Sequence, residues 1–208
     1  MNTLIDLSYP LCNGMPCYPG DPEIILKQVK DIKNDRTRVT EISFGSHTAT
    51  HADVPSHILE NGKALGDMDL LSFFGQAVKL SLTNYMKYDL REFKYDGIIL
   101  ETGWGEYYGD TEKYFGNTSP SVPLSLAENL SATGLKFFGC DLPSVDKSGA
   151  KEKIIHQKFL SKNIVIYENL ANLEKLPEGV PFTFIGFPLN IPGIDGSPVR
   201  ATAVLKDM

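Results

Sequence analysis

Three of the four histidines in this chain of 208 residues fall within one short segment, SHTATHADVPSHI. Packing gives histidines no reason to cluster, whereas metal binding does, because neutral imidazole is a common ligand for zinc, manganese and iron. An aspartate in the same segment adds a carboxylate. The fold must therefore hold this segment in one fixed shape. The clustered residues are His47, His51, Asp53 and His57.

The clustered segment is predicted to be extended. His47 and His51 are four positions apart, which would suit a helix, but the ring of Pro55 would clash there with the carbonyl of His51. The three histidines and the aspartate all occupy odd positions, so an extended chain directs them to one side. A bend near residues 48–50 is then needed to bring His47 to the same ion as His51, because ligand atoms lie about 2.0–2.2 Å from a metal.

A set of two histidines and one aspartate leaves coordination positions open for water and substrate, which is typical of a catalytic site. His57 follows the Pro55 turn and is either a further ligand or a general acid or base. Glu168 follows the apolar run IVIY, at the carboxyl end of a predicted strand, where functional side chains gather. His156 lies in a predicted helix. Spacing alone is equally consistent with Glu168 as a structural acid, and with His156 as an exposed residue on the surface of the helix.

Short apolar runs mixed with a few helical patterns predict an α/β domain. Helices are expected over 125–133 and 151–162, with a short third helix over 65–74. Few helical patterns separate the early strands, so a mixed sheet is favoured over a regular doubly wound one. No repeat or linker is present, and we expect a single domain over residues 1–208. The predicted strands are 4–7, 39–44, 76–82, 97–100, 135–138, 164–167 and 182–185.

Composition and termini exclude several functions. The formal net charge is -6 and no run of Lys and Arg is present, so nucleic acid is not an expected partner. No stretch approaches the ~20 apolar residues of a membrane span, and the first residues do not resemble a signal peptide. Cys12, Cys17 and Cys140 show no CxxC spacing, which favours reduced thiols in a cytoplasmic protein. The absence of a GxSxG elbow argues against a serine hydrolase.

Aromatic residues follow a Gly-Trp-Gly turn in the middle of the chain. Trp104, Tyr107 and Tyr108 form a patch that either lines a substrate pocket or serves ordinary loop packing.

The segment from His47 to His57 resembles the HxGTHxDxPxH signature of the cyclase family, whose members include bacterial kynurenine formamidases and isatin hydrolases. The likeness covers nearly the whole chain. Further similar segments are 18–21, 102–104, 141–146 and 193–200. The resemblance implies a swivelling β/β/α fold, usually assembled as a homodimer.

The resemblance also implies roles for particular residues. The implied metal ligands are His47, His51, Asp53, His156 and Glu168. Asp53 and Glu168 would be shared between two ions, while His57 would be the catalytic acid–base residue. Tyr18 would contact the substrate. Zinc is the expected metal and manganese the alternative, because imidazole and carboxylate ligands suit both.

The implied activity is hydrolysis of a carbon–nitrogen amide bond, converting an N-formyl aryl amine to formate and an aryl amine, as in tryptophan catabolism. The expected partner is therefore a small aromatic amide. One alternative is isatin hydrolase-like cleavage of a cyclic amide or lactone. Another, of a different class, is metal-dependent binding of a small molecule without turnover.

Two positions depart from the family pattern. Ala49 stands at the motif glycine, so we expect its backbone to avoid the φ values that only glycine adopts cheaply. Tyr18 stands where formamidases usually carry tryptophan. Its smaller, hydroxylated ring can still stack on an aryl substrate.

Overall fold

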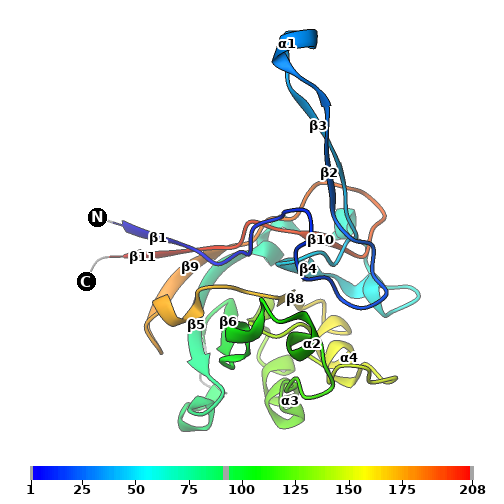
Figure 1. The fold of residues 1–208 in the computed structure, drawn as a ribbon. Helices are drawn as coiled ribbons and strands as arrows, with labels where there is room; N and C mark the ends of the chain where they lie inside the picture. Colours follow the sequence, from blue (N-terminus) through cyan, green and yellow to red (C-terminus); the bar gives the residue numbers. More distant parts are fainter. Residues whose placement is uncertain (1, 91–93, 207–208) are drawn as a thin grey trace.

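A nine-stranded mixed sheet lies at the centre of the computed structural model, which describes residues 2–90 and 94–206 (Figure 1). Its strands are β1 (Asn2–Asp6), β4 (His51–Asp53), β5 (Phe74–Ser81), β6 (Gly97–Glu101), β7 (Phe137–Cys140), β8 (Val165–Glu168), β9 (Pro181–Ile185), β10 (Gly196–Pro198) and β11 (Thr202–Lys206). Their order in the sheet is β1-β11-β9-β5-β6-β7-β8-β4-β10. The three pairs from β5 to β8 are parallel, and the flanking pairs are antiparallel. The predicted α/β class with a mixed sheet is confirmed.

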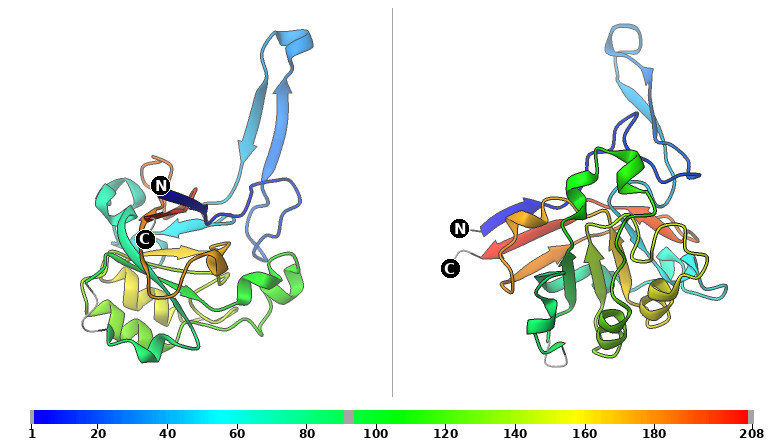
Figure 2. Two further views of the ribbon diagram at one scale, coloured as in Figure 1. Left: turned by 90° about the vertical axis from the view of Figure 1, so that its left-hand side faces the viewer. Right: turned by 60° about the horizontal axis from the view of Figure 1, so that its bottom comes forward.

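The central strands alternate their side chains between two apolar cores. In β6, Ile98 and Leu100 enter the core that contains helices α3 (Leu124–Ser131) and α4 (Ile154–Leu160). Ile99 enters the opposite core, with Phe137 and Phe184. A sheet covered on both faces requires apolar residues at consecutive positions, which explains the continuous runs in the sequence. Figure 2 shows the two helices together beneath the parallel strands.

All seven predicted strands are present, with their ends shifted by no more than two residues. The predicted helix over 151–162 begins only at Ile154, because the carboxylate of Asp146 accepts hydrogen bonds from the backbone N–H groups of Ile155 and His156. The helices are short, and none in the described part of the chain has the length and apolar character that a membrane crossing demands.

The single helix predicted over 65–74 is wrong. Two 3-10 helices occupy this stretch, η2 (Leu65–Asp67) and η3 (Leu70–Phe73), and Phe74 already belongs to β5. Extended backbone at Met68, with φ -80 and ψ 141, separates them. The Asp69 carboxylate begins the second one by accepting from the Leu71 N–H group. A local side-chain hydrogen bond thus competes successfully with a continuous helix.

Strands β2 (Ile25–Lys30) and β3 (Val39–Ser43) form a separate antiparallel arm that projects from the body, with the short helix α1 (Ile32–Asp35) at its tip (Figures 1 and 2). Within the two strands, every side chain except Leu26 is exposed. The arm therefore adds nothing to the two cores of the body.

Gly97 begins β6 directly against the neighbouring strand. A Cβ atom at Gly97 would lie 1.8 Å from Cε2 of Phe137, whose ring is fully buried. Gly97→Ala is expected to lower the free energy of unfolding by about 3 kcal/mol, because the core must overpack to admit the methyl group. Urea denaturation measures the change.

The matched control is Gly109→Ala, because nothing lies within 4 Å of a Cβ built at that position. Its free energy of unfolding should change by no more than about 0.5 kcal/mol. Equal denaturation midpoints for the two variants would contradict the packing of β6 on β7.

Candidate metal centre

The pairing of β4 with β8 brings three candidate ligands together. The two strands run antiparallel, with His51 opposite Glu168 and Asp53 two positions along the same strand. Opposed residues, and residues two apart on one strand, share a face of a sheet. His51 Nε2 consequently lies 3.2 Å from Asp53 Oδ1 and 3.6 Å from Glu168 Oε2. All three side chains are buried.

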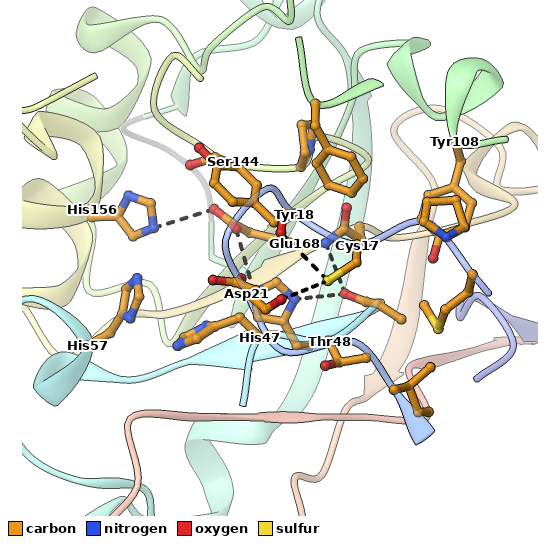
Figure 3. Close-up of a pocket in the computed structure, with 18 of the residues that line it drawn as sticks. Cys17, Tyr18, Asp21, His47, Thr48, His57, Tyr108, Ser144, His156 and Glu168 are labelled. Carbon is orange, nitrogen blue, oxygen red and sulfur yellow. Dashed lines mark hydrogen bonds and ion pairs between the residues drawn. The ribbon is translucent and has the colours of Figure 1, made fainter. Parts of the chain in front are cut away.

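Helix α4 supplies His156 from another direction (Figure 3). Its Nε2 atom lies 3.5 Å from Asp53 Oδ2 and 3.4 Å from Glu168 Oε1. Each carboxylate therefore has one oxygen near His51 and the other near His156. His156 is only 2% exposed, which rules out a position on the helix surface.

Hydrogen bonds on the far side of each ring orient His51 and His156. His51 Nδ1 lies 2.8 Å from the carbonyl oxygen of Ala49, and His156 Nδ1 lies 2.6 Å from Asp146 Oδ2. Both partners are acceptors, so each Nδ1 carries a proton and the Nε2 atom faces the carboxylates. Metal-binding histidines are commonly oriented in this way, by an acceptor behind the ring.

The two central carboxylates carry opposite pKa shifts. Burial, reinforced by the charge of Asp53, raises the pKa of Glu168. Burial opposes ionisation of Asp53 as well, but the adjacent rings of His51 and His47 hold the pKa of Asp53 well below its usual range. Asp53 is fully buried, and its Oδ2 atom has no hydrogen-bond donor among the described residues. Such an oxygen is costly unless a cation pairs with it, so the residues present fit a bound metal ion.

His47 and His57 share a carboxylate that sequence reasoning missed. Asp195 Oδ2 lies 2.8 Å from His47 Nε2 and 3.2 Å from His57 Nδ1. His47 Nδ1 lies 2.7 Å from Asp53 Oδ1. Burial disfavours a charge on His47, but Asp53 and Asp195 outweigh burial and raise the pKa of His47 to about 11. Burial, which disfavours the charged imidazole, is the largest effect at His57 and lowers the pKa of its ring.

The bend predicted at residues 48–50 is present, but the expectation for Ala49 is wrong. Its φ is 53, in the left-handed region. This conformation lets the Ala49 carbonyl accept hydrogen bonds from both His51 Nδ1 and Asn169 Nδ2, at 2.8 Å and 2.9 Å. The left-handed conformation costs an alanine about 1 kcal/mol. Two buried hydrogen bonds offset that cost, so the motif does not require glycine here.

A pocket opens beside the cluster (Figure 3). Side chains of His47, His57 and His156 line one end of it, together with Glu168. Aromatic and apolar side chains line the rest, among them Met15, Tyr18, Tyr108 and Phe115. The rings of Tyr18 and Phe115 meet edge to face, with centroids 5.6 Å apart. The pocket therefore joins a charged end to an aromatic wall.

The residues of the mid-chain aromatic patch have different roles, two in loop packing and one in lining the pocket. Trp104 serves packing, because its Nε1 donates to the Tyr114 carbonyl at 3.0 Å and its ring contacts the core around α3 and α4. Tyr107 packs against Trp104. Of the three residues in the patch, only Tyr108 lines the pocket beside the histidines.

Sequence comparison identifies relatives over almost the full chain. The profile of the cyclase family matches residues 5–147. A kynurenine formamidase of Bacillus cereus is 31% identical over 204 residues, which cover 95% of each chain. The chain belongs to the cyclase family.

Solved structures share the fold of this cyclase-family chain. An isatin hydrolase bound to the product analogue thioisatinate superposes with a TM-score of 0.85 at 19% identity, covering 99% of this chain and 93% of that one. A protein described as a potential metal-dependent hydrolase with cyclase activity superposes with a TM-score of 0.80 at 21% identity, covering 100% of both chains. These likenesses concern the fold.

Three residues of the site were not singled out from the sequence. Asp146 and Asp195 lie within segments 141–146 and 193–200, which resemble cyclase-family motifs, so those motifs held the signal that could have found them. Asn169 had no such signal. It follows β8, and its backbone carbonyl accepts a hydrogen bond from Thr50 Oγ1 at 2.5 Å.

Proposed function

We propose that this cyclase-family chain is a metal-dependent hydrolase that cleaves a carbon–nitrogen amide bond in an arylformamidase-type reaction. One observation carries the proposal. Two buried carboxylates, Asp53 and Glu168, each face the imidazoles of both His51 and His156 at the charged end of a pocket with an aromatic wall. The kynurenine formamidase relative supports an aryl amide as substrate.

The proposed metal ligands form two groups that share two carboxylates. The ligands are His47, His51, Asp53, His156 and Glu168. His47 and His51 would serve one ion and His156 the other, with Asp53 and Glu168 between them. Two groups of residues have ligand atoms within 4.8 Å of one another, His47 with Asp53 and His57, and His51 with Asp53 and Glu168, which supports cation binding around Asp53. The place of His156 is supported by its Nε2 atom, 3.5 Å from Asp53 Oδ2 and 3.4 Å from Glu168 Oε1. Zinc is the first choice and manganese the second. When bound, the cation would acidify a water molecule and polarise the amide carbonyl.

His57 is proposed to carry the proton during the reaction. Asp195 faces its Nδ1, which leaves Nε2 for exchange with the reacting groups. Its lowered pKa keeps the ring neutral near pH 7, so it can accept a proton from the attacking water. It then donates that proton to the amide nitrogen as the carbon–nitrogen bond breaks. The water oxygen leaves in formate, and the proton leaves on the aryl amine.

The test is a substrate panel with the purified protein loaded with zinc or manganese. We expect formate release from N-formyl aryl amines, with the aryl ring held by Tyr18 and Phe115. Faster opening of cyclic amides or lactones would favour an isatin hydrolase-like reaction. Saturable binding of these compounds without any product would favour a binding protein and overturn the proposal.

The proposal includes a homodimer formed through the arm. Five large apolar side chains of the arm are between 43% and 61% exposed, namely Ile25, Val29, Ile32, Val39 and Ile42. An isolated hairpin is marginally stable in water, and monomers rarely expose such a surface. A second copy of the chain would cover it. The arm also adjoins the site, because Ile24 lines the pocket just before β2 and His47 follows β3 by four residues.

Ile42→Glu is expected to halve the mass measured by light scattering, from a dimer to a chain of 23.0 kDa. The charge would be buried without a partner in the dimer and exposed in the monomer. Met86→Glu is the control, because Met86 is 81% exposed and lies outside the arm. A wild-type protein with the mass of one chain would contradict the dimer.

Two general features complete the proposal. Strands from both ends of the chain, β1 and β11, pair in the same sheet, so we propose that residues 1–208 act as one hydrolase domain. The cysteines Cys12, Cys17 and Cys140 are unpaired. Free thiols suit a reducing compartment, which supports a cytoplasmic location.

A further inference from the structure

At the end of the pocket away from the proposed metal ligands, one lining residue has a hydroxyl group without a hydrogen-bond partner among the described residues. In Figure 3, His57 and His156 lie at one end of the pocket, and Tyr108 lies at the other. The Tyr108 hydroxyl is buried, and none of the described residues forms a hydrogen bond with it. Buried hydroxyl groups normally have a partner, so this one requires an explanation.

Neighbouring rings hold Tyr108 in place. Its ring stacks on that of Tyr9, with centroids 3.5 Å apart and planes 4° from parallel. It meets the edge of Tyr114 at 5.3 Å. Both neighbours use their own hydroxyl groups within the protein. Tyr9 donates to the Gly105 carbonyl, and Tyr114 bonds to Asn169 Oδ1 and the Asp141 carbonyl. Of these three neighbouring tyrosines, Tyr108 alone presents an unpaired hydroxyl.

The protonation state of the Tyr108 hydroxyl determines which kind of group can pair with it. Burial is the main cause that raises the pKa of Tyr108, with smaller contributions from Tyr9, Cys12 and Cys17. The phenol therefore stays protonated and acts as a donor. A donor fixed by stacked rings in a pocket is suited to a carbonyl or carboxylate oxygen of a bound molecule, since leaving it unpaired on binding would carry a penalty.

We propose that Tyr108 determines specificity by donating a hydrogen bond to an acceptor oxygen on the aryl part of the substrate, away from the amide that is cleaved. This inference rests on the proposed function for the orientation of the substrate. The preferred substrate is then an aryl amide that carries a carbonyl or carboxylate substituent, and an aryl amide with a purely apolar substituent is disfavoured.

The test compares Tyr108→Phe with the wild type on matched substrates. The probes are formanilides with an acetyl group at each ring position in turn, and their ethyl counterparts, which lack the acceptor oxygen. We expect the wild-type preference for the acetyl compound, measured as a ratio of kcat/KM, to fall about 3- to 10-fold in the variant at the position that faces Tyr108. The loss should appear in KM, and kcat for the ethyl compounds should not change.

The control is Tyr107→Phe, which removes the hydroxyl of the adjacent residue. The Tyr107 ring lies beneath the Lys113 ammonium at 3.2 Å and does not line the pocket. Its substrate ratios should equal those of the wild type. Tyr108→Phe should keep the wild-type melting temperature or exceed it, because the removed hydroxyl has no partner to lose. Unchanged ratios at every ring position in Tyr108→Phe would overturn the inference.

A binding measurement distinguishes failure of this inference from failure of the proposed function. Calorimetry with acetylanilines and ethylanilines needs no turnover. If the wild type hydrolyses no formanilide but still binds the acetyl compound more tightly, and Tyr108→Phe does not, the proposed function fails and the role of Tyr108 stands. If neither amine binds the wild type and the kinetic ratios show no change, the role of Tyr108 is wrong.

Discussion

Replacing Asp53 with asparagine is expected to remove bound metal and to lower kcat/KM on the order of 10³-fold. Among the described residues, only Asp53 has carboxylate oxygens that face three of the candidate histidines, His47 and His51 on one oxygen and His156 on the other. An amide in its place carries no charge and offers one oxygen instead of two. The buried cluster would then lose the anion that best offsets a divalent cation. Elemental analysis and a formate assay measure the two effects.

The control for this substitution is Glu60→Gln, the same change from carboxylate to amide on an exposed side chain seven positions further along. It should leave metal content and activity unchanged. Circular dichroism shows whether both variants keep the fold. Undiminished metal content in Asp53→Asn would refute the ligand assignment, whatever the activity.

Replacing His57 with alanine is expected to lower kcat by about 10²- to 10⁴-fold while the metal stays bound. His57 lies in the 3-10 helix Pro55–His57, with its ring 4.1 Å from that of His47 and 5.4 Å from that of His156. It is thus beside the proposed ligands, and its ligand atom also falls in one candidate group with His47 and Asp53, so metal content separates the two roles. Full activity in this variant would remove His57 from the mechanism, and loss of metal would make it a ligand instead.

The pH profile offers a second measurement on His57. A depressed pKa means that the neutral ring, which can accept a proton, is present above that pKa and is lost as the pH falls through it. Burial, the largest effect, places the pKa of His57 below 6.5. The wild-type kcat/KM should therefore decrease on the acid side of pH 6.5, and the residual activity of His57→Ala should lack that decrease. Restoration of the rate by added imidazole would support a proton-transfer role.

The strands that form the sheet were predictable because burial on both faces leaves long apolar runs. The run at 164–167 is an example, since Val165 and Tyr167 enter one core and Ile166 the other. The strands that were missed lack this signal. β10 has only three residues and contains Pro198, and β2 is exposed at every position except Leu26. β11 was also missed, although Ala203 is buried within it.

Several residues of the candidate site were named from the sequence, but Asp146, Asp195 and Asn169 were missed, and the way the residues come together was not predictable. The spacing of His51 and Asp53 indicated a shared face, and that face exists in β4. No local pattern could show that Glu168 lies opposite His51, because the register of β4 on β8 is set by contacts distant in the sequence. The left-handed Ala49 was unpredictable for the same reason. Its conformation depends on the side chain of Asn169, which directly follows β8 and donates a hydrogen bond to the Ala49 carbonyl.

Asp146 links the first turn of α4 to the His156 imidazole, one of the proposed metal ligands. One carboxylate accepts hydrogen bonds from the backbone N–H groups of Ile155 and His156 and from the imidazole of His156. Fraying of the first turn of α4 would consequently release the imidazole at the same moment. If His156 holds a cation as proposed, fraying of α4 and loss of that cation would be one cooperative event. Heating would then produce no populated intermediate in which α4 is frayed and the metal is still bound.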